Sequence, residues 1–115
     1  TMLITIHGTG IELTEALKQY AEKKIESLTK FYGNITKAAI DIGVTTHHHH
    51  KGSIYYAEVN LSVPKNTLRV VKEEEDLYKA IDKVKDHLKV ELEKLKEKRQ
   101  HRDKKVLRSN KEYRG

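Results

Sequence analysis

The 115-residue chain contains no cysteine and no tryptophan, and it has a single proline. Without cysteine it can form no disulfide, no zinc ribbon and no thiol nucleophile. It also lacks any apolar run near the roughly 18 residues that a membrane-spanning helix needs and any charged-then-apolar secretion signal. We therefore expect a cytoplasmic protein without membrane contact.

Charge, in contrast, is abundant: 23 Lys and Arg face 17 Asp and Glu, which gives a formal net charge of +6. The two signs balance over residues 1–63, and residues 64–93 carry a net charge of −1. Residues 94–115 carry +7, from ten cations and three acids. Such an end is typical of an arm that binds nucleic acid, although attachment to a membrane surface or simple solubility gives the same pattern.

The apolar residues are patterned, which argues against disorder. Alternation predicts four strands, over residues 2–7, 38–46, 53–63 and 67–72. Apolar spacings of three and four predict two helices. The first has an N-cap at Thr14 and a left-handed C-cap at Gly33-Asn34, and the second covers residues 76–102.

Each strand has one apolar face and each helix has one apolar stripe. The predicted fold is therefore α+β in the order β-α-β-β-β-α, with two helices packed on one face of a four-stranded sheet. We expect one domain over residues 2–102 and a basic, flexible tail over residues 103–115.

The second helix carries the most informative pattern. Its stripe consists of Leu77, Ala80, Ile81, Val84, Leu88, Leu92 and Leu95. A step of about 100° per residue places Lys83 and Lys94 on one flank of the stripe and Lys85, Lys89 and Lys96 on the other. Outward positions fall to Asp82, Asp86, Glu93 and Glu97. Beyond Leu95 acids nearly vanish, and a helix that packs at one end and is cationic at the other predicts a ligand dense in phosphate.

Two segments carry a family resemblance. Gly8 is followed by Glu12-Leu13-Thr14-Glu15-Ala16-Leu17, then by Tyr20, Lys24, Leu28 and Phe31-Tyr32. The second segment reads Asp76-Leu77-Tyr78-Lys79-Ala80-Ile81-Asp82. From Met2 to about Lys98 the chain resembles the ribosome hibernation promoting factors and ribosome-associated inhibitor A proteins, formerly described as sigma-54 modulation proteins.

The resemblance implies the same β-α-β-β-β-α fold and a protein that is not an enzyme. It implies binding to the ribosomal RNA of the small ribosomal subunit, in the channel for messenger and transfer RNA, and inhibition of translation in stress and stationary phase. Longer members add a linker and a C-terminal dimerisation domain. The sequence fits either a short member or the first part of a longer one.

The expected RNA-binding residues are the cations of the two helices, because phosphates dominate nucleic-acid affinity. They are Lys18, Lys23, Lys24, Lys30, Lys83, Lys85, Lys89, Lys94, Lys98, Arg99 and Arg102. The resemblance supports Lys24, Lys94 and Lys98 in particular. His87 and Val90 replace two cations that are common in the family, and Lys85 and Lys89 lie beside them as substitutes. For the first helix, an ordinary solvated face is the alternative.

Tyr20, Tyr32 and Tyr78 are able to stack on bases, but their helical spacing favours packing at the core or its edge. Tyr55 is expected on the buried face of its strand and Tyr56 on the other. His47–His50 suggest a loop with adventitious metal affinity, since neighbouring strand residues point to opposite faces and no carboxylate cluster completes a metal site.

No catalytic constellation or phosphate-binding glycine loop is found, so we expect no cofactor, no metal and no small-molecule substrate. Two other functions fit the pattern. A double-stranded RNA-binding module also sets helices against a sheet, and a regulator of transcription would act through protein contacts.

Overall fold

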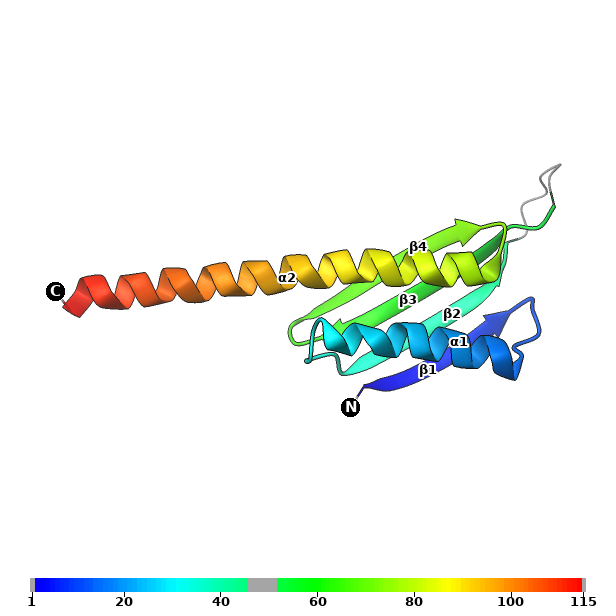
Figure 1. Cartoon of the computed structure of the whole chain (residues 1–115), viewed down its shortest axis with the longest axis horizontal. Helices are drawn as coiled ribbons and strands as arrows, with labels where there is room; N and C mark the ends of the chain where they lie inside the picture. The colour runs from blue at the N-terminus through cyan, green and yellow to red at the C-terminus, as the bar shows by residue number, and fades with distance from the viewer. Residues whose placement is uncertain (1, 46–51, 115) are drawn as a thin grey trace.

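The computed structural model describes the backbone of residues 2–45 and 52–114 (Figure 1). Within these ranges the side chains are described as far as Lys98. Its elements are β1 (Leu3–Thr9), α1 (Glu15–Glu26), the 3₁₀ turn η1 (Ser27–Lys30), β2 (Lys37–Val44), β3 (Tyr55–Val63), β4 (Asn66–Glu74) and α2 (Leu77–Arg114). The predicted order of strands and helices is confirmed.

The strands form one mixed sheet in the order β1-β2-β3-β4. β1 runs parallel to β2, whereas β3 is antiparallel to both of its neighbours. α1 connects the two parallel strands. Gly8 and Thr9 pair with Ile42 and Gly43 of β2. Because of this pairing, β1 ends at Thr9, two residues later than the sequence predicts. The chain then turns at Gly10, whose φ is +69°.

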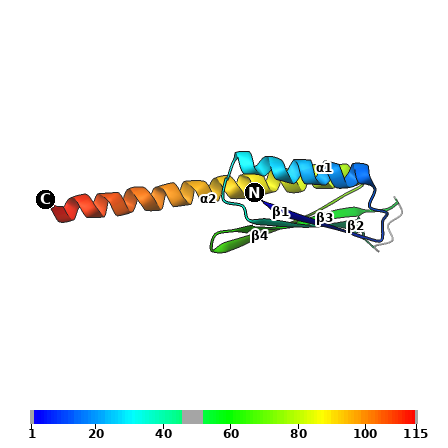
Figure 2. The same cartoon turned by 90° about the horizontal axis from the view of Figure 1, so that it is seen from below.

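Both helices cover the same face of the sheet, and the other face is open (Figure 2). Their apolar stripes meet the inward side chains of the strands, as predicted. The largest fully buried side chains are Ile25, Leu28, Ile42, Val59, Leu61, Ile81, Val84, Leu88 and Leu92. This core holds α1 and the first half of α2 side by side, which fixes the relative positions of the cations that they carry.

The first helix begins as predicted and ends differently. Thr14 Oγ1 accepts a hydrogen bond from Leu17 N at 3.2 Å, which is the expected N-cap. At the other end, the hydroxyls of Ser27 and Thr29 donate to carbonyl oxygens one turn earlier, and the last turn tightens into η1. The predicted left-handed cap at Gly33 is wrong: within the described residues a positive φ occurs only at Gly10, Gly52 and Lys65.

The second helix is longer than predicted. Leu95 still packs against the core, but α2 continues through Arg114, and the molecule measures 68 × 30 × 18 Å as a result (Figure 1). The sequence predicts a flexible tail from residue 103, where the structure has helical backbone. Lys, Arg, Glu and Gln favour helix, and extending an existing helix needs no new nucleus. No helix in the described part has the length and hydrophobicity for a membrane span.

Candidate nucleic-acid interface

α1 and α2 meet along a line on the outer side of the helical layer, which we call the seam. It runs from the contact of Tyr20 with Tyr78 to that of Phe31 with Lys89. Four side chains interlock near its start and form what we call the tyrosine cluster: Tyr20, Lys24, Tyr78 and Asp82. Tyr20 donates its hydroxyl hydrogen to Asp82 Oδ1 at 2.6 Å, and Lys24 Nζ lies 3.5 Å from the same oxygen. The Tyr20 and Tyr78 rings make an edge-to-face contact with centroids 4.8 Å apart.

The chemistry of Tyr20 follows from this contact. The hydrogen bond to Asp82, with burial and the charge of Asp82, raises the pKa of Tyr20 from 10.0 to about 12. The hydroxyl of Tyr20 therefore remains a protonated donor to higher pH than it would without Asp82. Lys24 Nζ also lies 5.5 Å from the centroid of the Tyr20 ring, so the cluster is held by several contacts at once.

Farther along the seam, α2 contributes free positive charge. Lys89 Nζ lies 4.5 Å from the centroid of the Phe31 ring, a cation–π contact with the end of the first helix. Lys85 lies three residues after Asp82 and four before Lys89, so it occupies the same side of α2. Lys23 and Lys30 are exposed on the first helix and on η1. Lys85 and Lys89 give the seam its positive edge.

The opposite flank of α2 faces β4, and its cations have acidic partners. Lys83 forms an ion pair with Glu74 of β4. Lys94 Nζ lies 3.6 Å from Glu91 Oε1, and His87 Nε2 lies 3.4 Å from the same oxygen. Lys83 and Lys89 thus lie on opposite flanks of α2, as helical periodicity predicts. Acidic partners neutralise much of the positive charge on the β4 flank.

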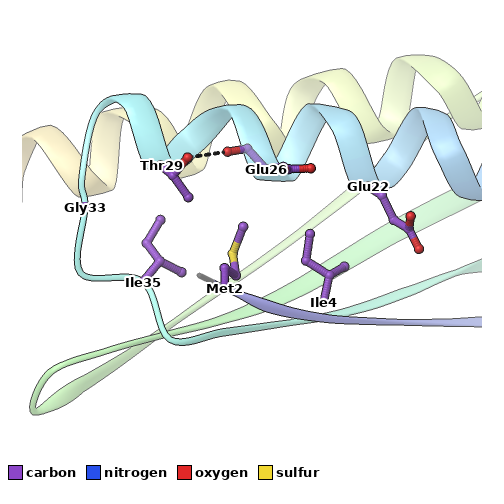
Figure 3. Close-up of a pocket in the computed structure, with 7 residues that line it drawn as sticks. All are labelled: Met2, Ile4, Glu22, Glu26, Thr29, Gly33 and Ile35. Atoms are coloured by element: carbon purple, nitrogen blue, oxygen red, sulfur yellow. Dashed lines mark hydrogen bonds between the residues drawn. The ribbon is translucent and has the colours of Figure 1, made fainter.

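Lys18 lies apart from the seam, because it is one turn before Glu22 on the β1 side of α1. A cavity of about 460 Å³ lies between β1 and the first helix on the side of Glu22, and Figure 3 shows the residues around it. It is lined by Met2, Ile4, Glu22, Glu26, Thr29, Gly33 and Ile35. The two carboxylates repel phosphate, so this side does not suit RNA.

The open face of the sheet is occupied by acidic hydrogen-bonded groups. Asp41 accepts hydrogen bonds from Thr9 and Tyr56, each at 3.2 Å. Glu58 accepts from Arg69 at 3.1 Å, which lowers the pKa of its carboxyl group. Tyr56 lies on the predicted face, with its ring over Gly43. Carboxylates at the middle of this face disfavour contact with a polyanion.

The predicted cations thus do not form one cluster. Lys24, Lys85 and Lys89 lie along the seam, whereas Lys83 and Lys94 lie on the β4 flank. Lys23 and Lys30 are exposed on the first helix and on η1. Lys98 is exposed where α2 leaves the sheet. For Arg99 and Arg102 the structure describes only helical backbone.

Sequence reasoning did not predict the roles of two side chains at the seam. Asp82 was expected to point outward but faces α1, where it binds Tyr20 and Lys24. Phe31 was assigned to the apolar stripe and additionally supports Lys89. The repeated i, i+4 placement of Tyr20 and Lys24, and of Tyr78 and Asp82, was the available signal for two facing polar edges.

Metal binding receives no geometric support from the described part of the chain, in which no group of three or more His, Asp or Glu side chains is arranged to hold an ion. His47–His50 lie outside the described residues.

Comparison with known proteins gives a consistent result. Residues 4–100 match the profile of the family described as sigma 54 modulation protein / S30EA ribosomal protein. Ribosome hibernation promotion factors from Staphylococcus aureus and Deinococcus radiodurans are 30% and 32% identical to the chain over 91 residues, or 79% of its length. These residues are 46% and 47% of those proteins, so the chain spans about half the length of the curated relatives.

Solved structures agree with the fold. The N-terminal domain of Protein Y from Thermus thermophilus is 26% identical with a TM-score of 0.68, and the match covers 82% of this chain and 97% of that one. A ribosomal subunit interface protein from Coxiella burnetii has a TM-score of 0.72 at 24% identity, covering 83% and 98%. Because the profile covers most of the sequence, the chain belongs to the sigma 54 modulation protein / S30EA ribosomal protein family.

Proposed function

We propose that this protein is a ribosome hibernation factor. It binds ribosomal RNA of the small subunit in the channel for messenger and transfer RNA, and it inhibits translation by occupying that channel rather than by catalysis. Support comes from the names of its relatives, which include ribosome hibernation promotion factors and a ribosomal subunit interface protein.

The distribution of charge along α2 carries the proposal. Residues 1–95 have no net charge, whereas residues 96–115 hold nine Lys and Arg and three Asp and Glu, which is the entire net charge of +6. Helical backbone projects this segment from the domain through Arg114 (Figure 1). The positive edge of the seam leads into it through Lys85 and Lys89.

Such a surface suits structured RNA. Cations that neutralise phosphates release condensed counterions, which supplies affinity without base readout. Folded RNA is recognised largely by its shape and backbone. The packed half of α2 fixes the orientation of the projecting half, so a bound molecule would exclude messenger and transfer RNA by its volume.

Pelleting of small subunits over a range of salt concentrations tests the proposal. The paired substitutions Lys89→Met and Lys98→Met keep long apolar stems but remove two charges. We expect them to reduce the magnitude of the salt slope of binding by about two. The matched control, Lys18→Met with Lys37→Met, removes two exposed charges away from the seam and should bind like the wild type.

Failure of the wild-type chain to sediment with small subunits at about 0.1 M salt contradicts the proposal. So does equal loss of binding in the control pair. Equal affinity for plain duplex RNA would favour the double-stranded RNA-binding alternative.

A further inference from the structure

Tyr78 is exposed in a way that core packing does not explain. The large apolar side chains with high exposure in the described part of the chain are Leu3, Val71, Tyr78 and Val90, and Tyr78 is the aromatic one, at 41%. Tyr20 and Tyr32, by comparison, pack against the core. Tyr78 contacts the edge of the core through Tyr20, and its packing at this edge leaves much of its side chain exposed.

The Tyr78 ring is also fixed in position. Its backbone N–H donates to Asp76 Oδ1 at 2.9 Å, which caps the start of α2. Its ring contacts Tyr20 at an interplanar angle of 75°, and Tyr20 is in turn held by Asp82 and Lys24. A ligand that binds the exposed part of this ring meets a pre-organised surface and immobilises little.

The charges around Tyr78 select the kind of ligand. Asp76 accepts the backbone hydrogen bond of Tyr78, and Asp76 and Asp82 both lie close enough to Tyr20 to raise its pKa. These carboxylates repel phosphate. A nucleobase is neutral, has a π face, and carries amino groups that donate to a carboxylate.

The phosphates of the RNA strand that carries this base would bind farther along α2. Lys85 follows Tyr78 by seven residues on the same side of α2, or about 10 Å along the helix axis. Lys89 lies one turn farther. The seam therefore offers an aromatic, acidic end for a base and a cationic continuation for the backbone of the strand.

We propose that Tyr78 is a stacking platform for an unpaired nucleobase, with the tyrosine cluster holding its ring in place. The site rests on the proposed function, because the base belongs to the ribosomal RNA that the helices bind. It adds a contact with a base to a surface otherwise devoted to phosphates.

A series of substitutions at Tyr78 tests the site, with retention on small subunits measured at several salt concentrations. Stacking predicts that Tyr78→Leu weakens binding about five- to a hundredfold. The loss should be the same at every salt concentration, because no charge is removed. Tyr78→Phe and Tyr78→Trp keep an aromatic face and should bind as well as the wild type or better.

Wild-type affinity in Tyr78→Leu overturns the stacking site and leaves the proposed function standing, provided that the wild type binds with a steep salt dependence. A wild-type chain that is not retained overturns both. If Tyr78→Leu does not fold, as judged by circular dichroism, Tyr78→Met serves in its place. If Tyr78→Phe and Tyr78→Trp weaken binding as much as Tyr78→Leu does, the result also contradicts stacking.

Discussion

At the scale of single residues, Asp82 organises the contact between the two helices. One of its oxygens accepts the Tyr20 hydrogen bond and lies beside Lys24 Nζ. Helical periodicity gives the direction of Asp82 relative to its own apolar stripe, but it does not locate the neighbouring helix. The sequence therefore misassigns this carboxylate to solvent, although it correctly identifies the helix and its buried face.

Replacing Asp82 with Ala should lower the pKa of Tyr20 from about 12 towards its ordinary value of 10.0. Because the folded-state pKa is raised, the associated stabilisation is complete below the unfolded value and is lost as pH rises through about 12. Ultraviolet titration of tyrosinate should show a step near pH 12 in the wild type that moves to lower pH in the variant. Tyr78→Phe, which leaves the Tyr20–Asp82 bond in place, should retain the late step.

Glu58 provides a prediction at the acidic end of the pH scale. Its pKa lies below the ordinary 4.5 because of the hydrogen bond from Arg69, so its contribution to stability is present above the unfolded value and lost as pH falls through the folded one. Glu58→Gln should reduce the free energy of unfolding at neutral pH by less than about 1 kcal/mol. Denaturant melts should show this difference vanishing in acid; a difference that persists there contradicts the ion-pair explanation.

At the scale of secondary structure, apolar periodicity accounts for most of what is observed. It predicts every strand and both helices, since each has one face in the same core. It fails at boundaries that depend on partners or on local hydrogen bonds. Examples are the continuation of β1 by pairing with β2 and the closure of the first helix by Ser27 and Thr29 rather than by Gly33.

The two faces of α2 give a matched pair of substitutions. Leu88 is fully buried, and Leu88→Ala should cost about 2–5 kcal/mol in unfolding free energy through lost burial and a residual cavity. Val90 is 47% exposed on the same helix, and Val90→Ala should change stability by no more than about 0.5 kcal/mol. Urea melts of both variants measure the two values. Similar values for the two would contradict the orientation of α2.

At the scale of the whole molecule, sequence reasoning identifies the cationic residues but not which of them are available. Lys83 and Glu74 lie nine residues apart in sequence, on different elements, and become partners only through packing of α2 on β4. Similarly, Lys18 and Lys24 share a helix but face different neighbours. The charge asymmetry of the chain, in contrast, needs no structure and survives intact in the projecting half of α2.

Shortening the chain should weaken its binding to small subunits without lowering its stability. The core is complete at Leu95, so a chain that ends after Glu97 should melt close to the full-length protein. Its affinity for small subunits should fall and its salt slope should decrease, since residues 98–115 carry the whole net charge of +6. Melting far below the full-length chain would show instead that residues 98–115 stabilise the domain.

The most direct test of the central claim uses the absence of native cysteine. Single-cysteine variants at Lys85, on the seam, and at Asn60, on the open face of the sheet, can each carry a tethered iron chelate that cleaves nearby RNA by hydroxyl radicals. We predict strong cleavage of small-subunit ribosomal RNA around the messenger and transfer RNA channel from position 85, and little cleavage from position 60. Cleavage mainly from position 60, or none from either position in a complex that does form, would contradict RNA binding by the helical face.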